Sequence, residues 1–298
     1  MEELERLKSK IKNASELQSV VKIMKTISAA NIREYGQAAE SLIQYNKTIE
    51  MGLQVVMLNN PDAFLAMRPT EEEKRLGVVI FGSDQGLAGR FNEQIAGYAI
   101  HKINEIENQE RIALAVGERI VGRLEEEGLH VETHLSFFEK TMGITQVMTD
   151  VLVRIEEWRL QRGINQIILF YNRPTSGASF APQMSYLFPL DMNWLKGLSQ
   201  KKWPSRSLPT FSMDADKLFS SLVRQYLFFS LYRAFVESLA SENASRLMAM
   251  QMAERNIEEH MNELTVQFNR RRQEAISEEL LDVVTGFEAL MGGGGKSE

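Results

Sequence analysis

Residues 82–89 form a glycine-rich stretch, Gly-Ser-Asp-Gln-Gly-Leu-Ala-Gly, between a short apolar run and a region with helical spacing. A loop after a strand and before a helix can hold phosphate through backbone N–H groups and the helix dipole. The glycines at 82, 86 and 89 match neither Gly-x-Gly-x-x-Gly nor Gly-x-x-x-x-Gly-Lys-Ser/Thr. The spacing therefore favours a tight turn before a helix capped by Asn92. Phosphate binding is the alternative.

The other side chains that could do chemistry do not gather in the sequence. His130 and His134 could share one face of a strand, but no third metal ligand stands near them. The absence of cysteine excludes disulfides, thiol nucleophiles and thiolate metal sites. Glutamate runs at 125–127, 258–259 and 278–279 have basic neighbours and are typical of solvated helix faces. The sequence predicts no catalytic residue, no metal site and no cofactor.

Both ends of the chain are predicted to be long helices. Residues 1–60 and 210–298 contain no proline, and their apolar side chains recur at steps of three and four, as on one helical stripe. We expect one slip in the first stripe, between Ala14 and Leu17. The expected stripe positions include Leu4, Leu7, Ile11, Ala14, Leu17, Val21, Met24 and Ile27, and later Leu247, Met250, Ile257, Met261, Leu264, Phe268, Ile276, Leu280, Val283, Val284 and Phe287.

The length of the C-terminal helix requires a partner outside its own domain. Seventy-odd residues at ~1.5 Å rise extend roughly 110 Å, whereas a small domain measures roughly 30 Å across. Two narrow apolar seams that face each other would form an antiparallel coiled coil. Two ordinary amphipathic helices of an α/β protein are the alternative.

The middle of the chain alternates between predicted strands and helices. This alternation is typical of βαβ units and of a mostly parallel, Rossmann-like sheet. The predicted fold is therefore α/β, with the coiled coil at residues 1–60 and 210–291, an inserted domain at 61–209 and a flexible tail at 292–298. Pro61, Pro69, Pro204 and Pro209 mark the linkers. Strands are expected at 76–81, 111–117, 129–135, 164–171 and 184–190, and helices at 92–106, 118–127 and 141–161.

Composition narrows the class of partner. The net charge of −6 gives no sign of nucleic-acid binding. No run of about 20 apolar residues is present, so no segment is expected to span a bilayer. We expect any membrane contact to be made through a partner.

Three stretches together resemble the gamma subunit of the F-type ATP synthase. They are 11–30, with Lys-Ile-Met-Lys-Thr-Ile-Ser-Ala-Ala at its centre; 82–92; and 231–250, followed by 268–280. The third is the most specific, and the three stand in the family's order along the whole chain. The family's organisation, terminal helices wound together around an inserted α/β domain, agrees with the fold predicted above.

The resemblance implies a rotor shaft with no active site of its own. The coiled coil would stand inside a ring of alpha and beta subunits, and the α/β domain would face the epsilon subunit and the membrane c-ring. Ion flow through the c-ring would turn the shaft and drive ATP synthesis or hydrolysis in the alpha–beta ring. The protein would be peripheral to the cell membrane, on its cytoplasmic side.

The resemblance also implies individual contacts. Arg272 and Gln273 match positions that hydrogen-bond a loop of the beta subunit, and Met24 matches a shaft position near the beta subunit's acidic lever. Met24 is equally compatible with a place in the helix seam. The lower-domain loop is represented by Ser83, Asp84, Gly86, Gly89 and Asn92.

The chain departs from the family's usual pattern at several of these places. Arg90 and Phe91 stand where glycine and leucine are usual, and Glu274 stands where a small residue is usual. Further departures are Asn31, Ile32, Gln85 and Ala88. Two other functions compatible with the sequence are a phosphate- or nucleotide-binding α/β protein with a coiled-coil arm and a dimeric coiled-coil adaptor.

Overall fold

The computed structural model describes residues 2–60, 75–106, 110–137, 143–175, 179–207 and 209–292. The chain divides into two compact units, of residues 1–27 with 250–298 and of residues 28–249. Helices α1 (Glu2–Asn59) and α6 (Ala215–Gly292) contribute to both units. The predicted linker residues Pro61 and Pro69 and the tail residues 293–298 lie outside the described residues.

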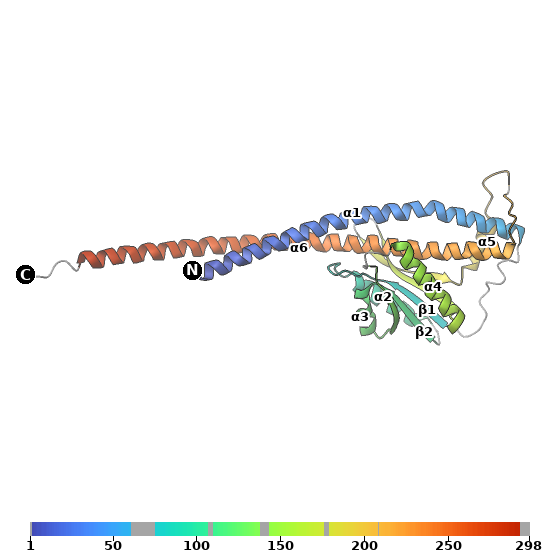
Figure 1. Cartoon of the computed structure of the whole chain (residues 1–298), viewed down its shortest axis with the longest axis horizontal. Helices are drawn as coiled ribbons and strands as arrows, with labels where there is room; N and C mark the ends of the chain where they lie inside the picture. The colour runs from blue at the N-terminus through green and yellow to red at the C-terminus, as the bar shows by residue number, and fades with distance from the viewer. Residues whose placement is uncertain are drawn as a thin grey trace, which may run out of the picture. The chain divides into compact units, whose positions relative to one another are not determined.

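The unit of residues 28–249 contains a five-stranded sheet in the order β3-β2-β1-β4-β5. Figure 1 labels two of its strands, β1 and β2, beside helices α2, α3 and α4. Strands β1 to β4 are parallel, and β5 is antiparallel to β4. The mostly parallel sheet confirms the predicted α/β class. The strands are β1 (Arg75–Phe81), β2 (Glu110–Val116), β3 (Val131–Leu135), β4 (Gln166–Pro174) and β5 (Phe180–Phe188).

Both faces of the sheet are covered because its strands alternate side chains between two apolar cores. Val78 and Ile80 of β1 join a core beneath helices α2 (Phe91–Glu105) and α3 (Glu118–Glu126). Val79 and Phe81 join a larger core on the other face. That core is covered by α4 (Ile144–Arg162), by α5 (Met192–Gln200), which the sequence did not predict, and by parts of α1 and α6.

Within this unit, α1 and α6 are antiparallel. The Asn31 side-chain amide donates to Asn243 Oδ1 at 3.2 Å, and the Tyr45 hydroxyl donates to Gln225 Oε1 at 2.9 Å. As the residue number rises along α1, the partner number falls along α6. The two helices are therefore paired in the predicted direction.

The unit of residues 1–27 and 250–298 has the same antiparallel pairing. Lys25 lies 2.5 Å from Glu254, and Glu3 lies 3.5 Å from Arg271. The buried positions on α1 recur every seven residues, as in a coiled coil; they are Leu7, Ala14 and Val21. Met250 and Leu264 are buried on α6.

The seam predicted on α1 was wrong at two positions. Leu17 and Ile27 are 58% and 54% exposed. The half-buried position after Ala14 is Gln18, four residues on, so the heptad continues without the predicted slip. The seam therefore follows the regular heptad spacing, although this places the amide of Gln18 in the seam and leaves the apolar Leu17 exposed.

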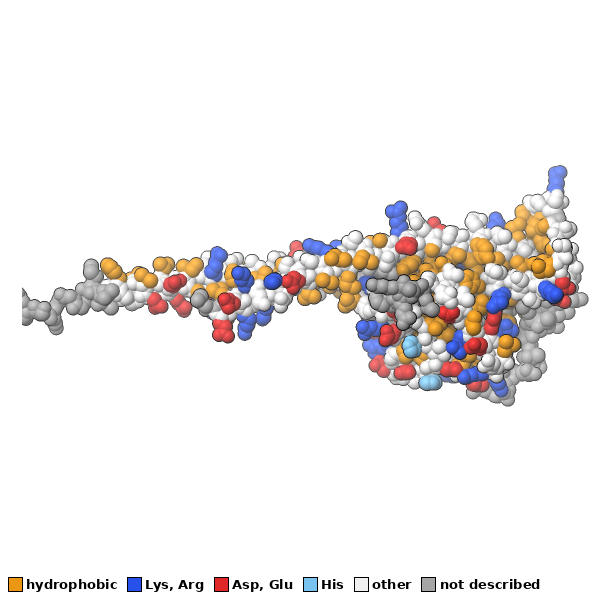
Figure 2. Space-filling view, in the orientation of Figure 1, with side chains coloured by type: hydrophobic (Ala, Val, Ile, Leu, Met, Phe, Trp, Pro, Cys, Tyr) orange, Lys and Arg blue, Asp and Glu red, His pale blue; other side chains and the backbone are white. Residues whose placement is uncertain are grey.

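The predicted stripe on α6 is also uncovered near its end. Glu3 pairs with Arg271, and α1 is described from Glu2 onward, so within the described residues α1 pairs with α6 only as far as the neighbourhood of Arg271. Figure 2 shows hydrophobic side chains interspersed with charged ones on this part of α6. The exposed apolar residues are Ile276, Leu280, Leu281, Val283, Val284 and Phe287. Among the described residues, no helix combines the length and hydropathy needed to cross a membrane.

Candidate functional site

The glycine loop leads from the end of β1 to the start of α2 and follows a tightly constrained path. A Cβ on Gly82 would lie 2.4 Å from Cβ of Ile120, so no larger residue fits there. Gly89 has φ +57° and Leu87 has φ +63°, both in the left-handed region. Leu87 is also 62% exposed. The loop thus holds an apolar side chain outward on a strained backbone.

Side chains within the loop fix this path. The Ser83 N–H donates to Asn92 Oδ1 at 3.0 Å, and Asn92 Nδ2 donates to Ser83 Oγ at 2.8 Å. The predicted helix cap at Asn92 was wrong, because α2 begins at Phe91 and Arg90 is the N-cap residue. Asn92 instead reaches back from the first turn of α2 to the loop.

Asp84 ties the loop to two other elements. Its Oδ1 accepts from the Glu118 N–H at 2.8 Å, and its Oδ2 accepts from the Phe137 N–H at 2.6 Å. The first bond satisfies a donor at the start of α3, where a carboxylate also suits the helix dipole. Both carboxylate oxygens of Asp84 therefore serve the local structure.

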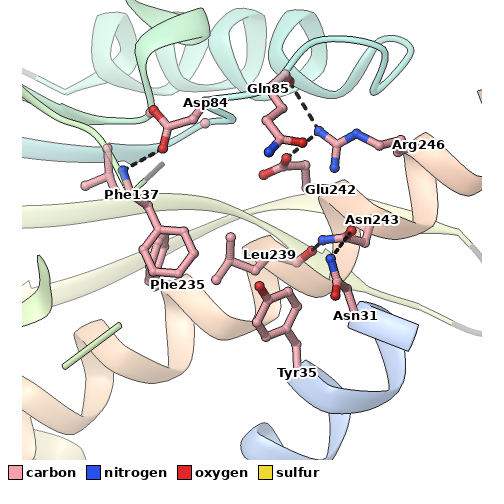
Figure 3. Close-up of a pocket in the computed structure, with 13 residues that line it drawn as sticks. Asn31, Tyr35, Asp84, Gln85, Phe137, Phe235, Leu239, Glu242, Asn243 and Arg246 are labelled. Carbon is pink, nitrogen blue, oxygen red and sulfur yellow. Dashed lines mark hydrogen bonds and ion pairs between the residues drawn. The ribbon is translucent and has the colours of Figure 1, made fainter. Parts of the chain in front are cut away.

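Side chains of helix α6 bind the glycine loop on the side that faces this helix (Figure 3). Arg246 donates to the backbone oxygens of Gln85 at 3.2 Å and Gly86 at 3.3 Å, and to Glu242 Oε1 at 2.6 Å. The Ser245 hydroxyl donates to the Ala88 carbonyl at 2.6 Å. The loop consequently turns carbonyl oxygens toward α6.

The charged pair at the centre of this contact is buried. The side chains of Arg246 and Glu242 are only 6% and 8% exposed. Burial raises the pKa of Glu242 to about 7, although the neighbouring Arg246 acts in the opposite direction. The negative charge of Asp84 raises the pKa of Glu242 further.

Glu242 borders a cavity of about 300 Å³ between α1, the loop and α6. Tyr35 borders the same cavity, and burial raises the pKa of its hydroxyl.

This arrangement argues against the phosphate-binding alternative. Ligands of open parallel sheets bind beyond the carboxyl ends of the strands, where the strand order reverses. Here that point lies between β1 and β4, and α6 occupies it. Ser241 donates to the Asn172 carbonyl in β4 at 3.1 Å, and Ser245 bonds the loop after β1. Phosphate needs N–H donors, whereas on the side that faces α6 this loop presents carbonyl acceptors to an internal arginine.

The predicted beta-subunit contacts lie in the unit of residues 1–27 and 250–298. Arg272 and Gln273 are exposed on α6, and Met24 is half-buried on α1. Glu274 bonds Arg270 and Arg271, at 3.0 Å and 3.1 Å, and the bond from Arg270 is the main cause of the lowered pKa of Glu274. Arg271 also pairs with Glu3, so about 21 residues of α1, or roughly 32 Å, separate the neighbourhood of Arg272 from Met24. These predicted contacts therefore form two places, not one.

Sequence reasoning missed the most connected residues of the site. Ser241, Glu242, Ser245 and Arg246 lie inside a stretch used only for its resemblance to a family. Their signal was the spacing of four residues between Ser241 and Ser245, and between Glu242 and Arg246, which puts each pair on one helix face. Polar residues in such a pattern on a long apolar helix indicate a buried polar contact.

The fold and the site define a class of protein: a helical pair that carries an α/β domain whose usual ligand crevice is filled by one of its own helices. A family model described as ATP synthase matches residues 3–290. The chain therefore belongs to the ATP synthase family.

Individual relatives make the assignment more specific. The ATP synthase gamma chain of a Sulfurihydrogenibium species is 28% identical over 290 residues, covering 95% of this chain and 97% of the relative. Two mitochondrial ATP synthase structures from Euglena gracilis share the fold. One is of the rotor, with a TM-score of 0.58, 16% identity and coverage of 92% of this chain and 98% of the other. The other is of OSCP, F1 and the c-ring, with a TM-score of 0.62, 18% identity and coverage of 99% and 97%. The chain is a gamma subunit, the non-catalytic central stalk component of that family.

Proposed function

We propose that this chain is the shaft that couples ion flow through a membrane c-ring to ATP synthesis or hydrolysis in an alpha–beta ring. The observation that carries the proposal is the antiparallel pairing of α1 and α6, marked by the Lys25–Glu254 and Glu3–Arg271 ion pairs. Two packed helices resist torsion better than one. The proposal keeps the division into shaft helices at 1–60 and 210–291 and an inserted domain at 61–209.

The exposed C-terminal part of α6 is proposed to be the surface of the shaft that slides against the alpha–beta ring as the shaft turns. Its exposed apolar residues, from Ile276 to Phe287, would contact the inner wall of the ring. Apolar contacts have no preferred direction, so they hold a shaft in place without fixing its angle. Large apolar exposure on a helix marks a surface that a partner covers.

Arg272 and Gln273 are proposed to bind a loop of a beta subunit. Both are exposed, while the neighbouring Glu274 is already bonded to Arg270 and Arg271. A guanidinium can present two parallel donors to a carboxylate, and an amide can add a neutral bond. Met24 is proposed as a second contact, distant along the shaft.

The α/β unit is proposed to face the epsilon subunit and the c-ring. Its glycine loop, with Ser83, Asp84, Gly86, Gly89 and Asn92, would serve as a rigid support that presents Leu87. The protein would then be held on the cytoplasmic side of the cell membrane by its partners.

The contact with the beta subunit is tested in a reconstituted complex. The alpha and beta subunits and this chain are assembled on the membrane part of the ATP synthase. We expect Arg272→Ala with Gln273→Ala to lower coupled turnover several-fold, because charge-assisted bonds that form and break during rotation are lost. Glu278→Gln, at an exposed position on the same helix, is the control. Full coupled turnover in the double variant would show that these two residues do not make the contact.

A further inference from the structure

One short stretch of α6 contains most of the buried polar side chains of the described chain. Seven of the eleven buried polar or charged residues fall between positions 237 and 246. They are Glu237, Ser238, Ser241, Glu242, Asn243, Ser245 and Arg246. Burial of polar groups is costly unless they are hydrogen-bonded. In this protein the buried polar groups are concentrated where α6 meets the carboxyl edge of the sheet.

Three of these side chains donate to backbone oxygens outside α6. The Ser241 hydroxyl lies 3.1 Å from the Asn172 carbonyl and shares its one proton with the Glu237 carbonyl of α6, at 2.9 Å. The Ser245 hydroxyl donates to the Ala88 carbonyl at 2.6 Å. Arg246 binds the carbonyls of Gln85 and Gly86. We call these three side chains and the four carbonyls the polar joint.

The receiving side of the joint is stiff. The loop carbonyls are held by the reciprocal Ser83–Asn92 bonds and by Asp84, which anchors the loop to α3 and to Phe137. Asn172 is fully buried in β4, and its side-chain amide donates to the Phe91 carbonyl at 3.3 Å. The joint thus connects α6 to a rigid edge of the sheet rather than to a mobile surface.

Hydrogen bonds and apolar contacts constrain a helix differently. The apolar core, which includes the contact of Phe235 with Phe81 at 5.6 Å between ring centroids, holds α6 against the sheet. Apolar attraction itself is not directional, so within this core the angle of α6 depends on the steric fit of its side chains. Hydrogen bonds weaken steeply as they bend. A one-residue slip of α6 would turn its face by about 100° and break every bond of the joint.

We propose that the polar joint transmits torque between the sheet and α6, with Arg246 as its central positioning residue. The inference rests on the proposed rotor function and assigns one step of it to named residues. Glu242 holds the Arg246 guanidinium in place at 2.6 Å. Helix α6 continues beyond Arg246 to Gly292 as one helix, and the proposed torque would pass along it.

The first experiment tests the joint in the full-length chain without any partner. Amide hydrogen exchange is followed at the hydrogen-bonded amides at the two ends of the loop, those of Ser83 and Phe91, whose acceptors are Asn92 Oδ1 and the Ala88 carbonyl. The variants are Arg246→Lys, which keeps the charge but lacks the guanidinium fork, and the milder Ser245→Ala. We expect exchange in this loop to accelerate by about tenfold, with α4 unchanged. Arg154→Ala, on the exposed surface of α4, is the matched control. Unchanged loop exchange in both variants would refute the joint.

The second experiment tests torque in the reconstituted complex. ATP-driven ion uptake and ATP hydrolysis are measured together while the opposing ion gradient is increased. We expect the joint variants to keep hydrolysis but to lose uptake per ATP as the load rises, because a loosened joint yields under torque. A merely structural defect would lower both rates at every load.

The outcomes separate the joint from the function on which it rests. Loop exchange that accelerates while uptake per ATP stays at the control value under full load would overturn the torque role. If the unsubstituted chain itself did not couple uptake to hydrolysis, the rotor function would be wrong. In that case the torque role would fall with it, and the exchange experiment would still decide whether the joint exists.

Discussion

Glu242→Gln is predicted to change how the stability of the unit of residues 28–249 depends on pH. Burial raises the pKa of Glu242 from 4.5 to about 7. The unfolded chain therefore releases this proton at lower pH than the folded chain does. Stability from this group is fully present below about pH 4.5 and is lost as pH rises through about 7. The glutamine variant has no such proton to lose.

The magnitude follows from the size of the shift. A difference of about 2.5 pKa units at about 1.36 kcal/mol per unit gives roughly 3 kcal/mol. We expect the free energy of unfolding of the unsubstituted chain, relative to Glu242→Gln, to fall by about that amount between pH 4.5 and pH 8. This is a large part of the stability of a typical domain.

The assay is urea unfolding monitored by tryptophan fluorescence at several pH values. All three tryptophans, Trp158, Trp194 and Trp203, lie in the unit of residues 28–249, so the signal reports on the unit that contains Glu242. Glu40→Gln, at an exposed position on α1, is the control. Parallel pH profiles for the unsubstituted chain and Glu242→Gln would refute the reasoning, because they would mean that Glu242 titrates alike in both states.

Two further predictions concern packing and surface charge. Gly82→Ala should destabilise the fold by about 1–3 kcal/mol, since its Cβ would meet Ile120 at 2.4 Å, whereas Gly86→Ala, where the space is open, should cost less. Equal unfolding midpoints in urea for the two variants would contradict the first. Lys25→Ala should cost less than about 1 kcal/mol, because the lysine of the Lys25–Glu254 pair is one-third exposed. A thermal unfolding shift that persists undiminished at high salt would show that this pair contributes more than a surface ion pair does.

The sequence allowed the elements to be predicted because each has a local cause. Proline-free ends with apolar steps of three and four predicted α1 and α6, and alternating apolar runs predicted the five strands. Helix α5 was missed, although α3, which also has nine residues, was predicted. The seam of α1 was misplaced at Leu17. Leu17 and Gln18 lie three and four residues after Ala14, and both spacings are compatible with one helix face, so spacing alone could not decide between them.

The candidate site depended on contacts between distant residues. Arg246 and Gln85 are 161 positions apart, and Ser245 and Ala88 are 157 apart. No spacing within either segment shows that they meet, because the meeting is produced by the order of the strands and by the pairing of α1 with α6. The role of Asn92 was misjudged for the same reason: its hydrogen-bonding partner depends on the path of the loop and not on the start of the helix.

The amino-acid sequence by itself determined that both ends are helices, that a mostly parallel sheet lies between them, and that no thiol chemistry is possible. These properties depend on residue type and short-range period, which the chain carries locally. Only the tertiary structure decided that α6 fills the crevice beyond β1 and β4, and that a buried arginine takes the carbonyls of the glycine loop. Burial and directional hydrogen bonds arise when remote segments pack together, so they decide which of the locally possible sites exists.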